Sequence, residues 1–254
     1  MNSFRSFLSE VGDIARFTGR FFREGFKPRY EPGELIRQCY QIGYNSLPLV
    51  GITAFIMGLV LTIQSRPTLV EFGAASLLPS MVSVSLIREI SPVITALIAA
   101  GKIGSSIGAE LGSMKVTEQI DAMEVSGTNP FKYLVVTRIL AATFMLPLLS
   151  LWANAVALYS GYLGVNIKGV VSWDLYWTQV FHALTYNDFI PSLTKTVFFG
   201  LTIGIIGCYK GYNSRKGTEG VGQSANSAVV VSSLLIFILD LIAVQITDAL
   251  GLNY

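Results

Sequence analysis

Five runs of apolar residues, each long enough to cross a bilayer, constrain this chain more than any other feature. They lie approximately at 47–65, 78–101, 134–160, 190–209 and 225–250. A helix needs about 20 apolar residues to span hydrocarbon of roughly 30 Å, and it satisfies its own backbone hydrogen bonds there. The runs therefore predict an all-α membrane protein with about five transmembrane helices.

Composition favours one integral-membrane domain over residues 1–254. The chain has 254 residues, of which 52% are hydrophobic and only 13% are charged. That balance is too apolar for an ordinary soluble domain, and the five runs leave no room for a second folded unit. We expect a five-span bundle over residues 47–250.

The cationic residues predict the orientation of this bundle. Segments 1–46, 102–133 and 210–224 hold thirteen Lys and Arg, whereas the two opposite connections hold Arg66 and Lys168. Cytoplasmic loops carry the excess of Lys and Arg. The N-terminus is therefore expected in the cytoplasm and the C-terminus on the other side.

Two segments outside the runs are amphipathic. Residues 1–30 predict an interfacial helix on the cytoplasmic leaflet, because apolar residues recur at three- and four-residue steps between arginines. A helix packed on a soluble partner is the alternative. The 161–189 connection carries a second stripe, which includes Trp173, Trp177 and Phe181 and is typical of the membrane–water interface.

Arg88 and Glu89 lie inside the second run. An ionised side chain at the bilayer centre costs about 2.5–3.5 kcal/mol, so both must face protein, water or substrate. If the span begins near Leu78, Arg88 lies roughly 15 Å deep. Pro92 follows, and its ring clashes with the carbonyl of Arg88 in a regular helix. We expect a kink or opening at the charged site.

Adjacent helical residues diverge by about 100°, so Arg88 and Glu89 need partners elsewhere. Candidates in the other runs are Gln64, Thr194, Lys195 and Asp240. Two interpretations stay open. Buried ion pairs, such as Arg88 with Asp240 or Lys195 with Glu89, can hold the bundle together. Alternatively, Arg88, Glu89, Lys195 and Gln64 line a polar cavity that binds a charged or zwitterionic substrate.

Two patterns follow the second run. Small residues at Gly101, Gly104, Gly108 and Gly112 predict close helix packing. Residues 110–124 then predict a short amphipathic helix in a cytoplasmic loop, suited to dock a motor subunit; a solvated helix without a partner is the alternative.

The sequence contains no complete nucleotide or metal motif. The closest match to a P-loop, residues 96–103, has Ala96 for the first glycine and Ile103 for the hydroxyl that binds Mg²⁺. His182 is the only histidine, and Cys39 and Cys208 are far apart in sequence. We therefore expect no metal site, no catalytic residues and no cofactor in this chain; ATP and Mg²⁺ would belong to a partner.

The most specific motif runs from residue 86 to residue 123 and reads LIREISPVITALIAAGKIGSSIGAELGSMKVTEQIDAM. It resembles the signature stretch of the MlaE-type (YrbE-like) ABC transporter permeases. The likeness extends to the basic N-terminus, to Lys195 in the fourth run and to Asp240 in the fifth.

The resemblance implies a permease of the bacterial inner membrane that moves phospholipid. It implies a homodimer with two ABC ATPase subunits and an MCE-domain (MlaD-like) ring, and no nucleic acid. Arg88, Glu89 and Lys195 then correspond to residues around a lipid cavity, and Asp240 to a structural acid. Residues 110–124 become the coupling helix. Its contact positions are Glu110, Met114, Lys115, Glu118 and Gln119. A scaffold for an MCE-type complex that moves no lipid itself is the alternative function.

Overall fold

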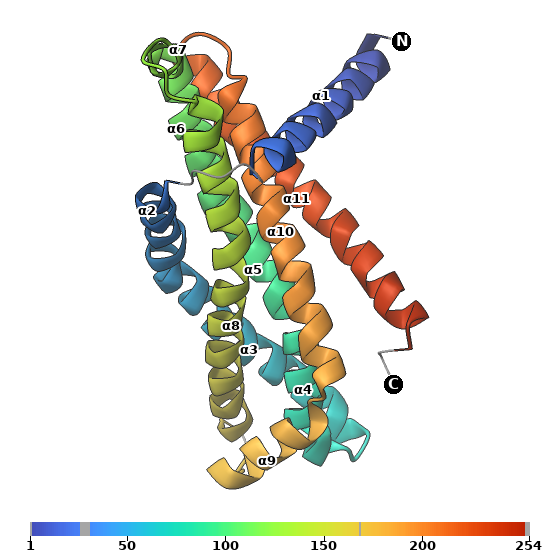
Figure 1. Ribbon diagram of the computed structural model, residues 1–254. Helices are drawn as coiled ribbons and strands as arrows, with labels where there is room; N and C mark the ends of the chain where they lie inside the picture. Colours follow the sequence, from blue (N-terminus) through green and yellow to red (C-terminus); the bar gives the residue numbers. More distant parts are fainter. Residues whose placement is uncertain (1, 26–30, 168, 252–254) are drawn as a thin grey trace.

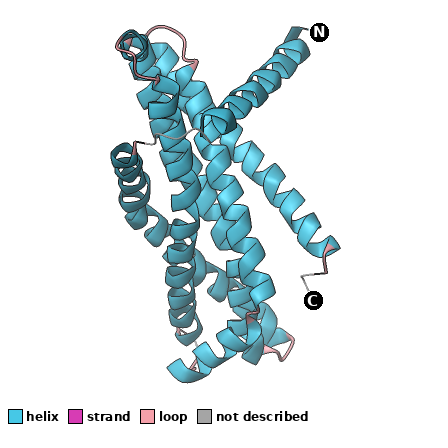
Figure 2. Cartoon of the chain, viewed as in Figure 1, coloured by secondary structure: helices cyan, strands magenta, loops and turns pink. Residues whose placement is uncertain are grey.

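The computed structural model describes residues 2–25, 31–167 and 169–251, and within them every regular element is a helix (Figure 2). Most of the long helices run roughly along one bundle axis, with α7 at one end and α9 at the other (Figure 1). We call these the α7 end and the α9 end. The sequence-based prediction of an all-α membrane protein is confirmed.

The elements follow one another with short connections. Their bounds are α1 Asn2–Gly25, α2 Pro32–Gly43, η1 Tyr44–Ser46, α3 Leu47–Glu71, η2 Ala75–Leu77, α4 Leu78–Ser85, η3 Leu86–Ile90, α5 Ser91–Ala99, η4 Ala100–Gly104, α6 Ser105–Val116, α7 Gln119–Val125, η5 Phe131–Val136, α8 Thr137–Asn166, α9 Trp173–Ala183, α10 Tyr186–Tyr212 and α11 Thr218–Ala249.

Five helical stretches are long and apolar enough to cross a membrane, as the sequence predicts. They cover Pro32–Glu71, Ala75–Val116, Phe131–Asn166, Tyr186–Tyr212 and Thr218–Ala249. Each is longer than its apolar run, because polar residues continue the helix beyond the hydrocarbon. Helix α2, which precedes the first run, was not predicted.

The second span contains two π-helical turns, η3 and η4. Pro92 is the second residue of α5, directly after η3. It cannot donate a backbone hydrogen bond and would crowd the carbonyl four residues back, and a π turn absorbs this irregularity. The expected opening at the charged site is present, since Arg88 and Glu89 lie within η3.

Helix α10 lies at the centre of the bundle and contacts α8, α6 and α11. Its glycines allow this. A Cβ added at Gly204 would lie 2.9 Å from the Cα of Ile139 in α8, and one at Gly211 would lie 2.9 Å from the carbonyl oxygen of Gly108 in α6. Small residues thus bring the backbones together.

The predicted glycine stripe packs over most of its length. Gly108 faces Ala225 and Gly112 faces Ser214, while Gly104 faces Ile203 of α10. Gly101 is exposed with open space around it, so packing does not explain a glycine there.

The second half of α1 docks against the α7 end of the bundle. Phe17 is buried and makes edge contacts with Phe131 and Tyr209, and Phe21 is buried beside it. Leu8 and Val11 remain exposed. The second half of α1 therefore packs on the protein, while the first half projects away from the bundle (Figure 1). The side chains of residues 1–7, like residues 26–30 and Lys168, lie outside the described part of the chain.

Helix α9 closes the opposite end and carries the predicted aromatic stripe. Trp173 and Trp177 contact each other, and Trp177 stacks on Phe181. Tyr176 is buried and donates a hydrogen bond to the carbonyl of Leu158 at 2.9 Å. Burial raises the pKa of the Tyr176 hydroxyl above its usual range, so it stays a donor.

Candidate functional site

Three elements bring charged side chains together near the α9 end: η3, α10 and α11. The ammonium group of Lys195 lies 2.7 Å from a carboxylate oxygen of Glu89 and 2.8 Å from one of Asp240. Lys195 is buried, Asp240 is mostly buried, and the Glu89 side chain is 46% exposed. One cation therefore joins the second, fourth and fifth spans.

Arg88 has a partner that the sequence analysis did not name. Its Nε donates to Asp188, a buried residue in the first turn of α10. Asp188 also accepts from the backbone N–H of Thr185 at 2.7 Å and from its hydroxyl at 2.8 Å, which completes a capping box. We call Arg88, Glu89, Asp188, Lys195 and Asp240 the Lys195 cluster.

The buried stripe of α11 ends at this cluster. Its members are spaced four residues apart, as expected for one face of a helix. They are Gly220, Ser224, Ala228, Ser232 and Ile236. Asp240 continues the stripe and reaches Lys195. The C-terminal part of α11 diverges from α10 (Figure 1).

A pocket opens where the two helices separate. It is lined by Arg88, Glu89, Asn187, Asp188, Pro191, Ser192, Lys195, Ala243, Val244 and Thr247.

The turn η3 lines a second pocket, which is mainly apolar. Leu86 and Ile90 contribute to it, together with residues of α5, of α3 and of α8. Those two side chains are four residues apart and share a face, whereas Arg88 lies between them in sequence and points elsewhere. One helical turn thus borders a charged pocket and an apolar one.

The first span contributes to these pockets differently from the prediction. Gln64 is exposed on α3 and lines neither pocket. Val50, Ala54 and Met57 of α3 line the apolar pocket instead.

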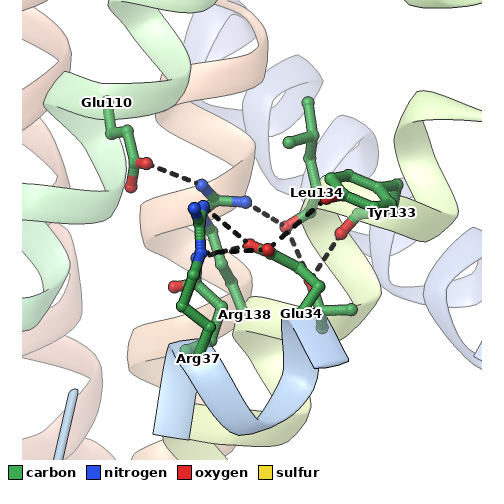
Figure 3. Close-up of polar contacts among 8 residues, drawn as sticks. Glu34, Arg37, Glu110, Tyr133, Leu134 and Arg138 are labelled. Carbon is green, nitrogen blue, oxygen red and sulfur yellow. Dashed lines mark hydrogen bonds and ion pairs between the residues drawn. The ribbon is translucent and has the colours of Figure 1, made fainter. Parts of the chain in front are cut away.

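A second charged cluster joins α2, α6 and the beginning of the third span (Figure 3). Arg138 is buried, with 1% of its side chain exposed; its Nη2 lies 2.9 Å from Glu110 of α6, and its Nη1 donates to the carbonyl of Leu134 at 3.0 Å. Nearby, Glu34 of α2 pairs with Arg37 at 3.0 Å. We call Glu34, Arg37, Glu110, Tyr133 and Arg138 the Arg138 cluster.

The segment predicted as a coupling helix, 110–124, is two helices, so the prediction of one continuous helix was wrong. Helix α6 ends at Val116, and α7 begins at Gln119. The break falls at Glu118, whose φ of 60° is left-handed, a conformation that cannot continue an α-helix.

The five predicted coupling residues point in different directions. Glu110 reaches Arg138, Met114 packs on the core, and Lys115 lies 2.8 Å from Asp121 of α7. Glu118 and Gln119 are exposed at the start of α7. Of the five, these last two are the most exposed.

Sequence reasoning missed Asp188 and Arg138. Arg138 lies inside the third apolar run and was therefore a detectable signal, as conspicuous as Arg88. Asp188 precedes the fourth run and follows Thr185 by three residues, the spacing of a capping box. Of the two ion pairs considered, Lys195 with Glu89 is present, whereas Asp240 pairs with Lys195 and not with Arg88.

The described residues contain no group of three or more His, Cys, Asp or Glu arranged to hold a metal ion. Cys39 and Cys208 are free thiols, and His182 is exposed on α9.

The fold and site define a polytopic helical membrane protein with a charged pocket between its spans. Residues 35–246 match the family described as Permease MlaE. A probable ABC transporter permease protein of Rickettsia felis is 41% identical over 232 residues, covering 91% of this chain and 90% of its own length. A probable ABC transporter permease protein of Synechocystis is 36% identical, covering 87% of this chain and 84% of its own.

A third relative is the intermembrane phospholipid transport system permease protein MlaE of Haemophilus influenzae. It is 33% identical over 219 residues, covering 85% of this chain and 84% of its own length. The chain belongs to the MlaE permease family, as the signature motif predicts. It is an integral membrane protein and a transport subunit rather than an enzyme.

Proposed function

We propose that this chain is the permease subunit of an ATP-driven phospholipid transporter of the bacterial inner membrane. The observation that carries the proposal is η3, one turn of the second span that borders both a charged pocket and an apolar pocket. A phospholipid is an amphiphile and needs both environments. The name of the Haemophilus influenzae relative, a phospholipid transport system permease, supports the same substrate class.

Arg88 is the residue that we assign to the lipid phosphate. Its guanidinium group carries five N–H donors, and the contact with Asp188 is made through Nε. Arginine binds phosphate well because its donors match two oxygens at once. Lys195, by contrast, already lies between two carboxylates, so its role is to hold η3 and α11 in place and to add positive charge to the pocket.

The pocket adjoins a helix face that supports a homodimer. Helix α11 is the least covered span, with 17% of its most apolar window buried, against 61% for the third span. Phe237, Ile238 and Leu241 are exposed on it, next to the pocket residue Val244. A second copy that packed on this face would close the charged pocket into a cavity between two subunits.

The charges and exposed residues at the two ends of the bundle support the assignment of the remaining partners. The α7 end carries most of the Lys and Arg outside the spans, so we assign it to the cytoplasm. Glu118, directly before α7, and Gln119 and Val125 of α7 are exposed there, a surface for one ABC ATPase per permease copy, which binds the ATP and Mg²⁺. The α9 end then faces the periplasm, where an MCE-domain ring would receive or supply the lipid.

The test is transport of a labelled phospholipid by the permease reconstituted with its ATPase. Arg88→Ala should lower transport roughly tenfold or more, because a charge-assisted contact is worth about 1.5–3 kcal/mol. Arg88→Lys should retain part of the activity. Thr194→Ala is the matched control, since Thr194 is exposed beside Lys195 and donates only to its own helix at Ile190.

Undiminished capture and transport of lipid by Arg88→Ala would contradict the headgroup role. A wild-type complex that assembles with its ATPase and an MCE-domain protein but moves no lipid would favour the alternative, a membrane scaffold that does not transport.

A further inference from the structure

We propose that Arg138 and Glu110 form an internal clamp between α8 and α6, so that Glu110 acts within this chain and not at the surface of the motor subunit. Arg138 is then a positioning residue for the coupling segment. The proposal deepens the proposed function and rests on it where transport is concerned. The clamp itself is defined by contacts within the chain.

The charge balance of Arg138 requires Glu110. With 1% of its side chain exposed, Arg138 is cut off from water, and Glu110 is the one acid that pairs with it among the described residues. Its Nη1 donates to Leu134 in its own helix, and its Nε is buried without a partner in the described part of the chain. A buried cation with a single counter-ion depends strongly on that ion.

The clamp joins two helices whose backbones make few direct contacts with each other. Helix α6 packs its glycine face on α11 and α10: Gly108 lies against Ala225, and Gly211 of α10 lies against Gly108. Glu110 leaves α6 on a different side and reaches Arg138 (Figure 3). The ion pair therefore joins α6 directly to α8.

The clamp joins the two helices that follow two π turns. Glu110 lies six residues after η4 ends at Gly104, and Arg138 lies two residues after η5 ends at Val136. A π turn holds one residue more than an α turn, and its conversion would turn the following helix by about 100° and shift it by about 1.5 Å. A register change at either π turn reaches the other helix through the clamp.

The same helix leads to the charged pocket. From α6 it continues back through η4 and α5 to η3, which holds Arg88 and Glu89. A displacement of α7 is thus transmitted along the chain to the pocket. The clamp determines how far α8 moves with it. This gives Glu110 a role different from that of Glu118, although both lie in the predicted coupling segment.

The first experiment compares Glu110→Gln with Glu118→Gln in the reconstituted complex. Glu110→Gln should leave the amount of bound ATPase unchanged and lower the lipid moved per ATP hydrolysed roughly tenfold, a typical size for coupling between sites. Glu118→Gln should instead lower the amount of bound ATPase. Equal loss of bound ATPase in both variants, or an unchanged ratio of lipid to ATP in Glu110→Gln, would overturn the proposal.

The second experiment does not depend on transport. Hydrogen exchange of the permease in lipid nanodiscs should speed up in 105–116 and 131–140 for Glu110→Gln and stay unchanged in α3. The double variant Glu110→Arg with Arg138→Glu should restore part of the protection. Unchanged exchange in Glu110→Gln would refute the clamp, even if the wild-type complex transports lipid. If Glu110→Gln does not fold, Glu110→Asp, which keeps the charge at a shorter reach, gives the same comparison.

Discussion

The two charged clusters of this permease hold a buried cation in opposite ways. In the Lys195 cluster, Lys195 contacts two acids from two other spans, and the cluster lines a pocket that leaves Glu89 about half exposed. In the Arg138 cluster, Arg138 has one acid and one backbone carbonyl, and it is almost completely shielded. The first cation has a spare partner, whereas the second has none.

Because of this difference, the ion pairs of Lys195 can rearrange, whereas the ion pair of Arg138 must stay formed. Lys195 can lose one carboxylate to a ligand or to a conformational change and keep the other. Arg138 cannot lose Glu110 without an uncompensated charge in the protein interior. The cation with two acidic partners accordingly borders the pocket, while the cation that pairs with one acid connects helices away from it.

Removal of Lys195 should have the largest effect. Lys195→Met removes the cation that Glu89 and Asp240 share, and Asp240 is mostly buried. The free energy of unfolding should therefore fall by about 3–5 kcal/mol. Thermal unfolding in nanodiscs measures this, and Lys195→Arg serves as the charge-conserving control. A Lys195→Met protein as stable as the wild type would show that the two acids are neutral or solvated.

The Arg138 cluster should respond asymmetrically. Glu110→Leu leaves Arg138, whose side chain is 1% exposed, without a counter-ion, and the free energy of unfolding should fall by about 3 kcal/mol. Arg138→Met leaves Glu110, whose side chain is 35% exposed, and should cost about half as much. The double variant should recover most of the loss, because an apolar pair can replace a buried ion pair. Additive losses in the double variant would remove the contrast between the clusters.

The glycine contact between α6 and α10 should matter less than either cation. A Cβ at Gly211 would lie 2.8 Å from the Cβ of Leu111, so Gly211→Val should cost about 1–3 kcal/mol through overpacking. Gly101→Ala, where space is open, should change stability by less than about 0.5 kcal/mol. Equal effects in denaturant unfolding would mean that α6 is not tightly packed on α10.

The smallest effect is expected at the break between α6 and α7. Glu118 has a φ of 60°, so Glu118→Gly should relieve strain and raise the free energy of unfolding by about 0.5–1 kcal/mol. The same variant should bind less ATPase, measured by co-purification, if Glu118 contacts the motor. If Glu118→Gly is more stable and still binds the same amount of ATPase, the Glu118 side chain does not contact the motor.

The spans could be predicted because they depend on local composition. Apolar runs of the right length must be helical in lipid, and a proline four residues after Arg88 must disturb the helix there, whatever surrounds it. The opening of the helix at η3 and the five spans follow from these facts. Helix α2 escaped prediction because its apolar and polar residues alternate around the helix and form no continuous run.

Only the tertiary structure decided which charges meet. Arg88 and Asp188 are 100 residues apart, and Arg138 and Glu110 belong to different spans, so their pairing depends on the rotation and tilt of whole helices. Those are set by glycine contacts such as Gly204 on Ile139. The sequence by itself determined that buried charges need partners, because an unpaired charge is too costly in a bilayer; helix packing selected the partners.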